Sequence, residues 1–411
     1  MKNTILERFL RYVTIDTQSD PASDSCPSTP GQLELGQLLV EELQSMGIND
    51  AHLDKNGYVM AGLPANTAGK VPAIGFIAHL DTSPDMSGHN VRPVIHNEYN
   101  GKDILLNSSG GTRMRVSDFP VLKQYIGQTL ITSDGTTLLG ADNKAGLAAI
   151  MSAIEYLTNN PDVPHGDIKI AFTPDEEIGK GADHFDVKKF GADFAYTVDG
   201  GEVGELQYEN FNAAHASVRI SGRNIHPGDA KNKMINATLL GMEYNRMLPD
   251  NERPEHTETY EGFYHLLSFK GNVETATMEY IIRDHDNQHF EQRKSKMRRI
   301  AARLNEKYGE GCFSIEIKDQ YYNMRNKLSP VMEIVELAQE AMQELKITPL
   351  IRPIRGGTDG ARLSYMGLPC PNLFAGGHNF HGRYEFVPLE SIERATEVIL
   401  AIIKKAAEPK K

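Results

Sequence analysis

The sequence is poor in cysteine, has no excess of positive charge and contains no long apolar run. Its three cysteines, Cys26, Cys312 and Cys370, lie far apart and form no CxxC pair, which argues against a thiolate zinc site and against a disulfide framework. We therefore expect reduced thiols and a cytoplasmic protein. The formal net charge of −12 argues against nucleic acid and anionic membranes as partners. No segment is apolar for long enough to span a membrane.

Length and composition predict two folded domains. A chain of 411 residues exceeds the usual size of a single core, and a hydrophobic fraction of 40% is enough for sizeable cores. Near the start of the sequence, Ile5, Phe9 and Val13 have the spacing of one helix face, with charged residues between them. This pattern predicts an amphipathic surface helix rather than a signal peptide.

The order of patterns along the chain predicts an α/β domain with an insertion. Residues 1–209 alternate strand and helix patterns, although residues 85–128 carry weak signals and predict a long excursion over a sheet. Residues 210–320 follow the order βαββαβ, which is typical of a ferredoxin-like unit. Residues 321–411 return to the first pattern, with a glycine-rich turn over residues 354–367. We expect one α/β domain with a central mixed sheet, interrupted by an inserted lid domain.

Three segments run apolar and then stop on residues that bind metals. The first, VPAIGFIAHLD, ends in His79 and Asp81; the second, IKIAFTPDEE, ends in Glu176 and Glu177; the third, DFAYTVDGG, carries Asp199. Each predicts a short buried strand with an acid or an imidazole at its carboxyl end. Because ligands gather at the carboxyl ends of strands in open α/β sheets, we expect these side chains to converge on one site.

Two further segments add candidates from outside these strands. Asp142, in GADNKAG, stands where the N-cap of a predicted helix belongs, so an ordinary capping role is an alternative to metal binding. His381 lies in the glycine-rich segment GGHNFHGRYE, where His378 competes for its role. Taken together, these His, Asp and Glu residues supply the mixed nitrogen and oxygen ligands that Zn²⁺ accepts in catalytic sites. Five ligands with one shared carboxylate predict two metals, about 3.5–4 Å apart.

The acids of this set can divide the chemical work. Adjacent carboxylates at a strand end point in different directions, so one of Glu176 and Glu177 can bind metal while the other moves protons. Asp81 lies two residues after His79, and in an extended chain such residues point the same way. A metal-binding imidazole usually donates its other nitrogen to a carboxylate or a carbonyl. Asp81 is therefore a candidate for orienting His79.

Ten segments spread over essentially the whole chain resemble the peptidase T family of co-catalytic dizinc metallopeptidases, whose members are tripeptide aminopeptidases. They are HLDTSPDMSGHNV, TLLGADNKAG, AFTPDEEIGKGADHF, YTVDGGEVGELQYENFNAA, HPGDAKNKMINA, YEGFYHL, YIIRDHD, YYNMRN, PIRGGTDGARLSYMGLPCPN and NFHGRYEF. The resemblance implies a zinc-peptidase-like catalytic domain with two Zn²⁺ per chain. It assigns His79 and Asp199 to one zinc, Glu177 and His381 to the other, and Asp142 to both as a bridge.

The resemblance also implies the remaining catalytic roles. Asp81 would orient His79, and Glu176 would act as general base and then general acid. The peptide bond between Asp142 and Asn143 is expected to be cis. Members often carry Asp where this chain has Asn143, but that residue is not an expected ligand.

Three residues are candidates for binding a tripeptide substrate. His226, in GRNIHPGDA, could stabilise the oxyanion if the lid closes over the site. Arg283, in YIIRDHD, and Arg355, in RPIRGGTDG, could hold the free carboxylate, because a guanidinium forks well onto carboxylates. A solvated surface role is the alternative for each of these side chains.

Three other functions remain open from the sequence. A related dizinc deacylase of N-acyl amino acids would share the metal site, and so would a carboxypeptidase of the same superfamily. A non-catalytic peptide-binding protein on a degenerate hydrolase fold belongs to another class, and the seven intact site positions argue against it. The mixed ligand set would also accept Co²⁺ or Mn²⁺. The sequence does not indicate the oligomeric state.

Overall fold

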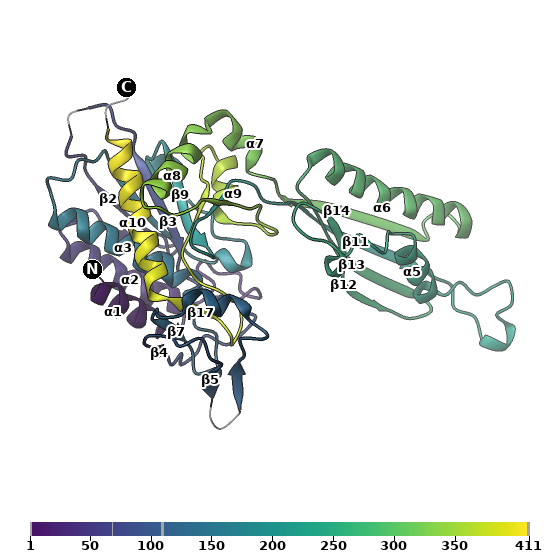
Figure 1. Ribbon diagram of the computed structural model, residues 1–411. Helices are drawn as coiled ribbons and strands as arrows, with labels where there is room; N and C mark the ends of the chain where they lie inside the picture. The colour runs from purple at the N-terminus through teal and green to yellow at the C-terminus, as the bar shows by residue number, and fades with distance from the viewer. Residues whose placement is uncertain (1, 68, 108–110, 409–411) are drawn as a thin grey trace. The chain divides into compact units, whose positions relative to one another are not determined.

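A computed structural model describes residues 2–67, 69–107 and 111–408, and these form two compact units (Figure 1). The first unit is built from three stretches of the chain, Met1–Tyr208, Asn326–Arg352 and Thr358–Lys411. The second contains Glu209–Arg325 and the short segment Pro353–Gly357. The second unit is therefore inserted into the sequence of the first, and the two are described separately below.

The first unit is organised around an eight-stranded mixed sheet. Four adjacent strands, β8, β3, β9 and β16, run parallel, whereas β2 pairs antiparallel with β8 and β10 pairs antiparallel with β16. The three apolar segments with polar ends form β3, β8 and β9, as predicted. In spatial order the strands are β1 (His52–Leu53), β2 (Val59–Leu63), β8 (Ile168–Thr173), β3 (Ile74–His79), β9 (Phe194–Gly200), β16 (Asn372–Phe374), β10 (Glu205–Gln207) and β15 (Leu350–Ile351).

Helices cover both faces of this sheet. Since side chains alternate along a strand, Phe76 and Tyr196 share one face, where Tyr196 donates to a carbonyl of α8. Here α3 packs on β3 and β9, and α10, the yellow helix in Figure 1, packs on α3 and α8. On the other face Ile77 joins an apolar cluster that includes Phe190 and Leu363. The helices are α1 (Lys2–Val13), α2 (Pro30–Ser45), α3 (Ala141–Asn159), α4 (Val187–Phe190), α8 (Glu333–Glu344), α9 (Asp359–Tyr365) and α10 (Leu389–Ala406). None of the described helices is both long enough and apolar enough to cross a membrane.

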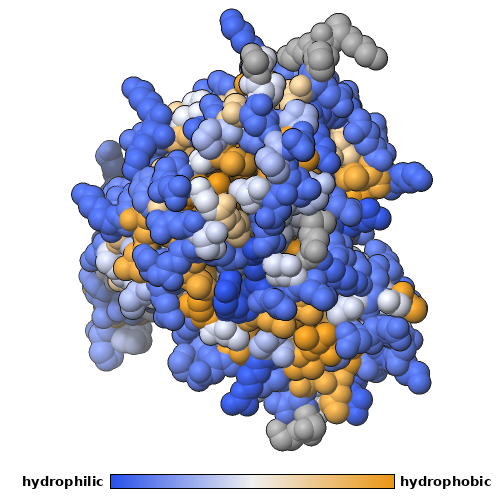
Figure 2. Space-filling view, turned by 90° about the vertical axis from the view of Figure 1, so that its left-hand side faces the viewer, coloured by the Kyte–Doolittle hydropathy of each residue, from blue (hydrophilic) through white to orange (hydrophobic). Residues whose placement is uncertain are grey.

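Two segments are more regular than the sequence indicated. Residues 85–128, predicted as a long excursion over a sheet, contain short strands, and their apolar side chains form a small core around Leu122 and Met114 that Phe386 also joins. Apolar side chains also reach the surface here, and Figure 2 shows that apolar patches interrupt an otherwise hydrophilic face of the molecule. Within the predicted glycine-rich turn, residues 359–365 form α9, capped by Thr358. The additional strands are β4 (Val94–His96), β5 (Ile104–Asn107), β6 (Thr112–Met114), β7 (Leu130–Thr132) and β17 (Phe386–Pro388).

The second unit has the predicted order of elements, βαββαβ. Its four-stranded sheet is antiparallel throughout, with β11 between β13 and β14 and with β12 at an edge. Both helices contribute to one apolar core, which includes Tyr244 of α5, Phe290 of α6 and Met278 of the sheet. The elements are β11 (Asn212–Ser221), α5 (Ala237–Arg246), β12 (Phe263–Gly271), β13 (Thr275–Asp284), α6 (Asn287–Tyr308) and β14 (Phe313–Tyr321), followed in the chain by α7 (Arg325–Leu328).

Gly146 allows α3 to pack closely on the sheet, and this contact can be tested. A Cβ atom at Gly146 would lie 2.0 Å from the Val198 carbonyl oxygen and 2.3 Å from Asn143 Oδ1. We expect Gly146→Ala to lower the free energy of unfolding by about 1–3 kcal/mol, the usual cost of overpacking, in a urea titration. Gly69→Ala is the matched control, because a Cβ atom at that position would have its nearest neighbours 3.9 Å away. Equal stability of the two variants would contradict the close contact.

Candidate metal centre

The structure brings all five predicted ligands together at the carboxyl end of the central sheet. His79 is the last residue of β3, and Asp199 is the last but one of β9. Glu177 lies in a 3₁₀ turn directly after β8, while Asp142 is in the first turn of α3. His381 is in the loop that follows β16. These positions explain the convergence, because parallel strands end at the same edge of a sheet.

Asp142 connects the two histidines through different carboxylate oxygens. Its Oδ1 is 3.0 Å from His79 Nε2, and its Oδ2 is 3.4 Å from His381 Nε2. His79 Nε2 also lies 3.3 Å from Asp199 Oδ1, and His381 Nε2 lies 3.0 Å from Glu177 Oε2. The five side chains therefore form two groups that share one carboxylate.

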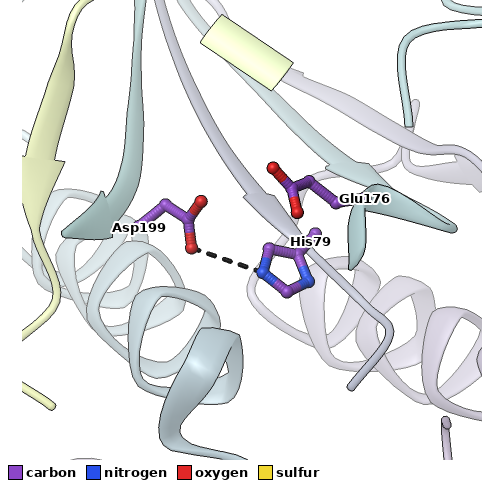
Figure 3. A group of neighbouring side chains, drawn as sticks. All are labelled: His79, Glu176 and Asp199. Carbon is purple, nitrogen blue, oxygen red and sulfur yellow. Dashed lines mark ion pairs between the residues drawn. The ribbon is translucent and has the colours of Figure 1, made fainter. Parts of the chain in front are cut away.

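Glu176 lies close to this cluster but forms no ion pair with its histidine His79. Ligand-type atoms of His79, Glu176 and Asp199 all lie within 4.8 Å of one another. In Figure 3 an ion pair joins His79 to Asp199, whereas the Glu176 carboxylate stands beside them and has no ion pair with His79. Burial, followed by the charge of Asp199, raises the pKa of Glu176 well above its usual value.

The outer nitrogen of each histidine is held by oxygen atoms. His79 Nδ1 donates to the main-chain carbonyl of Asp81 at 3.0 Å and lies 3.3 Å from its Oδ1. His381 Nδ1 lies 3.2 Å from Asp85 Oδ2. Since a main-chain carbonyl can only accept, Nδ1 of His79 is protonated, and Nε2 faces the acids.

Asp81 also fixes the turn that carries the two glutamates. Its carboxylate is fully buried, and it accepts hydrogen bonds from the main-chain N–H groups of Glu176 at 2.9 Å and Glu177 at 3.1 Å. Asp175, the residue before Glu176, has a buried carboxylate that accepts hydrogen bonds from the Ser28 N–H and from Gln32 Nε2. The backbone of this turn is thus anchored from both sides.

Two features at the start of α3 differ in how well the sequence predicted them. The peptide bond between Asp142 and Asn143 is cis, as the resemblance implied. The N-cap of α3 is Gly140 and not Asp142, which lies in the first turn at a kink with the non-helical backbone angles φ −83° and ψ 105°. The Asp142 carboxylate contacts the two histidines.

Electrostatics show that the cluster holds more carboxylates than its histidines neutralise. Burial raises the pKa of Glu177 to about 7 and that of Asp199 to about 6. Hydrogen bonds to Asp142 and Glu177 raise the pKa of His381 to about 11. Burial opposes ionisation of Asp142, yet hydrogen bonds from His381 and His79 outweigh it and hold its pKa below the usual range.

These residues fit divalent cations. Within residues 2–67, 69–107 and 111–408, Glu177 Oε1 is a buried oxygen with no hydrogen-bond partner, and such an atom is costly unless a cation or another donor meets it. Two imidazole nitrogens and several carboxylate oxygens match the ligand preferences of Zn²⁺ and similar metals. The clusters His79–Glu176–Asp199 and His79–Asp142–Glu177 each offer three ligand atoms within binding distance of one ion.

Sequence reasoning missed two buried acids near this cluster. Asp359, in the first turn of α9, accepts a hydrogen bond from Thr173 Oγ1 at 2.7 Å, and burial raises its pKa to about 7. Glu385 is bonded to the backbone that leads into Asp142. Asp359 follows a capping threonine and Glu385 follows His381 by four residues, so their only signal in the sequence was proximity to other motifs.

His378 and the substrate candidates Arg283 and His226 form hydrogen bonds with groups other than the five predicted ligands. The Nε2 atom of His378 is 2.6 Å from the Tyr125 hydroxyl, so this ring is engaged away from the acids. In the second unit, Arg283 Nη1 donates to the carbonyls of Ala214 and Ile282. His226 is exposed, and its Nδ1 accepts from the Gly228 N–H.

The candidate Arg355 is also bound within the second unit. Both of its Nη atoms donate to oxygens of the segment 257–261, namely those of Thr257, Thr259 and Glu261. Its guanidinium lies 5.1 Å from the centre of the Phe211 ring. A substrate carboxylate would have to compete with these contacts.

Comparison with known proteins assigns the family. The sequence pattern of peptidase family M20/M25/M40 matches residues 134–405, more than half of the chain. Peptidase T of Geobacillus sp. (strain WCH70) is 60% identical over 404 residues, which cover 98% of each chain. The chain therefore belongs to peptidase family M20/M25/M40. Peptidase T of Alkaliphilus oremlandii (strain OhILAs) is 59% identical over 406 residues, covering 98% of this chain and 99% of that one. Membership makes the protein an enzyme of the metallo-aminopeptidase class.

Solved structures of the family share the fold. Aminopeptidase PepT from Bacillus cereus and a tripeptidase from Staphylococcus aureus both match with a TM-score of 0.78, at 23% and 22% identity, and 99% of each chain is covered. A dinuclear metal-binding peptidase of the M20 family from Bacillus subtilis matches with a TM-score of 0.63 at 14% identity, covering 98% of this chain and 97% of that one.

The position of Asp142 between the two histidines predicts a specific loss of metal in a variant. We expect the wild-type chain to bind two Zn²⁺ after extensive dialysis, and Asp142→Ala to retain one or none, because the variant lacks the carboxylate common to both groups. Metal content per chain, measured by mass spectrometry, tests this. Glu34→Ala is the control, since it removes an acid at an exposed position of α2. Two metals retained by Asp142→Ala would rule out the shared carboxylate.

Proposed function

We propose that the protein releases the N-terminal residue from tripeptides, with two zinc ions and with Glu176 as general base and general acid. The observation that supports this most directly is the position of Asp142, whose two oxygens face different histidines. One carboxylate can then hold two cations side by side. When bound, such a pair supplies Lewis acidity and lowers the pKa of a water molecule toward neutrality.

The ligand assignment follows the two groups in the cluster. His79 and Asp199 would hold one cation, Glu177 and His381 the other, and Asp142 both. Zinc is proposed on the chemistry of the donors, which the metals next to it in the periodic table also accept. The outer hydrogen bonds that hold the two imidazoles would keep each Nε2 directed at its cation.

Glu176 is suited to move protons for three reasons. It is close to the proposed ligands, it forms no ion pair with His79, and burial raises its pKa, which is the direction that a proton carrier requires. Its carboxylate would take a proton from the attacking water and deliver it to the departing amine. Asp81, which binds the N–H groups of Glu176 and Glu177, would keep the base and the neighbouring ligand in a fixed relation.

The second unit is proposed to act as a lid that contributes substrate contacts. The Nδ1 atom of His226 accepts from the Gly228 N–H, which places the ring proton on Nε2 and makes that atom a donor for an oxyanion. Arg283 and Arg355 are proposed to bind the free carboxylate of the substrate. On this proposal the catalytic domain comprises residues 1–209 and 321–411, and the lid residues 210–320.

The tripeptide substrate is inferred from relatives. The related proteins from Geobacillus and Alkaliphilus are peptidase T, and one structural neighbour is a tripeptidase. The cytoplasmic location expected from the unpaired cysteines stays a prediction.

Removing the proton carrier should separate turnover from metal binding. Glu176→Gln keeps the shape of the side chain but cannot accept a proton at neutral pH. We expect kcat for tripeptide cleavage to fall by about 10²- to 10⁴-fold, while metal content stays at the wild-type level. Glu34→Gln, at an exposed position of α2, is the control. Near-normal turnover by Glu176→Gln would remove the general-base role.

Substrate variants test the peptidase assignment. We expect a free tripeptide to be cleaved with a higher kcat/KM than the matching dipeptide and tetrapeptide, and its N-acetylated form to be resistant. The first residue released from an unsymmetrical tripeptide should be the N-terminal one. Preference for the acetylated peptide would favour a deacylase, and release of the C-terminal residue would favour a carboxypeptidase.

A further inference from the structure

Glu385 is a buried carboxylate that no step of the proposed chemistry uses. Its side chain is 1% exposed. Its Oε2 accepts hydrogen bonds from the main-chain N–H groups of Leu139 and Gly140, both at 2.7 Å. Its Oε1 accepts from the N–H group of Asp142 at 3.0 Å. The carboxylate thus binds the backbone of the proposed bridging ligand and of two residues just before it.

This contact replaces a cap that α3 does not supply itself. The N-cap residue, Gly140, has no side chain that could accept from the first N–H groups of the helix. Glu385 provides the acceptor from a position 243 residues after Asp142. The unpaired N–H groups and the helix dipole favour a negative charge at this end, which offsets part of the cost of burying the carboxylate.

Glu385 and His381 belong to the same closed loop. His378 and Phe386 exchange two main-chain hydrogen bonds, at 2.9 and 3.1 Å, and so close the loop between them. Inside it, the Glu385 N–H donates to the Gly382 carbonyl at 3.1 Å, and His381 has a positive φ of 63°. A loop closed in this way moves as a unit, so the place of Glu385 determines the place of His381.

The loop therefore binds the proposed metal centre at two points. His381 Nε2 contacts Glu177 Oε2 at 3.0 Å and Asp142 Oδ2 at 3.4 Å, while Glu385 bonds the Asp142 backbone. We infer that Glu385 is a positioning residue that sets the separation between Asp142 and His381, and through it the affinity for the cation that Asp142, Glu177 and His381 share. This inference rests on the metal centre proposed above.

A purely structural role makes a different prediction. If Glu385 only capped α3, its loss would lower the stability of the protein but leave the geometry around a bound metal unchanged. A positioning role also changes the affinity for one of two metals and the ligand field at that metal. Outer partners of metal ligands typically contribute 10- to 100-fold to metal affinity.

The experiment compares graded variants of Glu385 with a matched control. Glu385→Gln keeps the shape and one acceptor oxygen, which can still serve Leu139 and Gly140 but leaves the Asp142 N–H facing an amide NH₂. Glu385→Ala loses all three bonds. The control is Asp54→Asn, because the Asp54 carboxylate also accepts two main-chain N–H groups, from Asn56 and Tyr58, in the same unit.

Two measurements are made on each full-length variant after circular dichroism has shown that it is folded. Competition titration with a chelator gives the affinities for the first and second Zn²⁺. Visible absorption after loading with Co²⁺ reports the geometry at each metal. We expect one of the two affinities to fall by about 10-fold in Glu385→Gln and by up to about 100-fold in Glu385→Ala, with altered Co²⁺ bands, and no change in Asp54→Asn.

The outcomes separate this inference from the proposed function. Wild-type affinities and unchanged Co²⁺ bands in both Glu385 variants would overturn the positioning role, and so would an equal loss in Asp54→Asn. If Glu385→Ala does not fold, the isosteric Glu385→Gln decides the question by the same criteria. A wild-type chain that binds fewer than two metals would instead refute the proposed metal centre itself.

Discussion

The structure depends on placing several negative charges in one buried location. Four acids of the cluster, Asp142, Glu176, Glu177 and Asp199, meet only two histidines there, and burial raises the pKa of three of them. Such crowding is unfavourable unless cations or hydrogen bonds compensate it. Buried acids outside the proposed ligand set, such as Asp81 and Glu385, accept hydrogen bonds from main-chain N–H groups, whereas the carboxylates of Asp142 and Glu177 contact the histidines.

Three buried carboxylates illustrate this division of roles, because each accepts main-chain N–H groups. Asp81 binds the turn after β8, Asp175 binds the segment at Ser28, and Glu385 binds the start of α3. Their charges are used to hold backbone rather than ligand. The result is that loops from distant parts of the chain are fixed against one another, with side chains that point to a common centre. A preorganised site of this kind spends little free energy on rearrangement when a metal or a substrate binds.

The elements of the fold that could be predicted from the sequence were those with a pattern among neighbouring residues. The strands β3, β8 and β9 were evident because apolar runs with polar ends are local patterns, and the βαββαβ order of the second unit was evident for the same reason. The strands β4, β5 and β6 within residues 85–128 were missed because each is only three or four residues long, and β4 pairs with β7, which lies outside this segment. The helix α9 was missed because glycines around it favour a turn.

The sequence by itself determined the chemical composition of the site: which acids and imidazoles end the strands, and the fact that nitrogen and oxygen ligands occur together. Only the tertiary structure decided which oxygen faces which nitrogen and that the two oxygens of Asp142 face different histidines. It also decided that Asp359 and Glu385 lie beside the cluster. The physical reason is that strand formation follows from the spacing of neighbouring residues, whereas a hydrogen bond between Glu385 and Asp142 exists only after the intervening chain has folded.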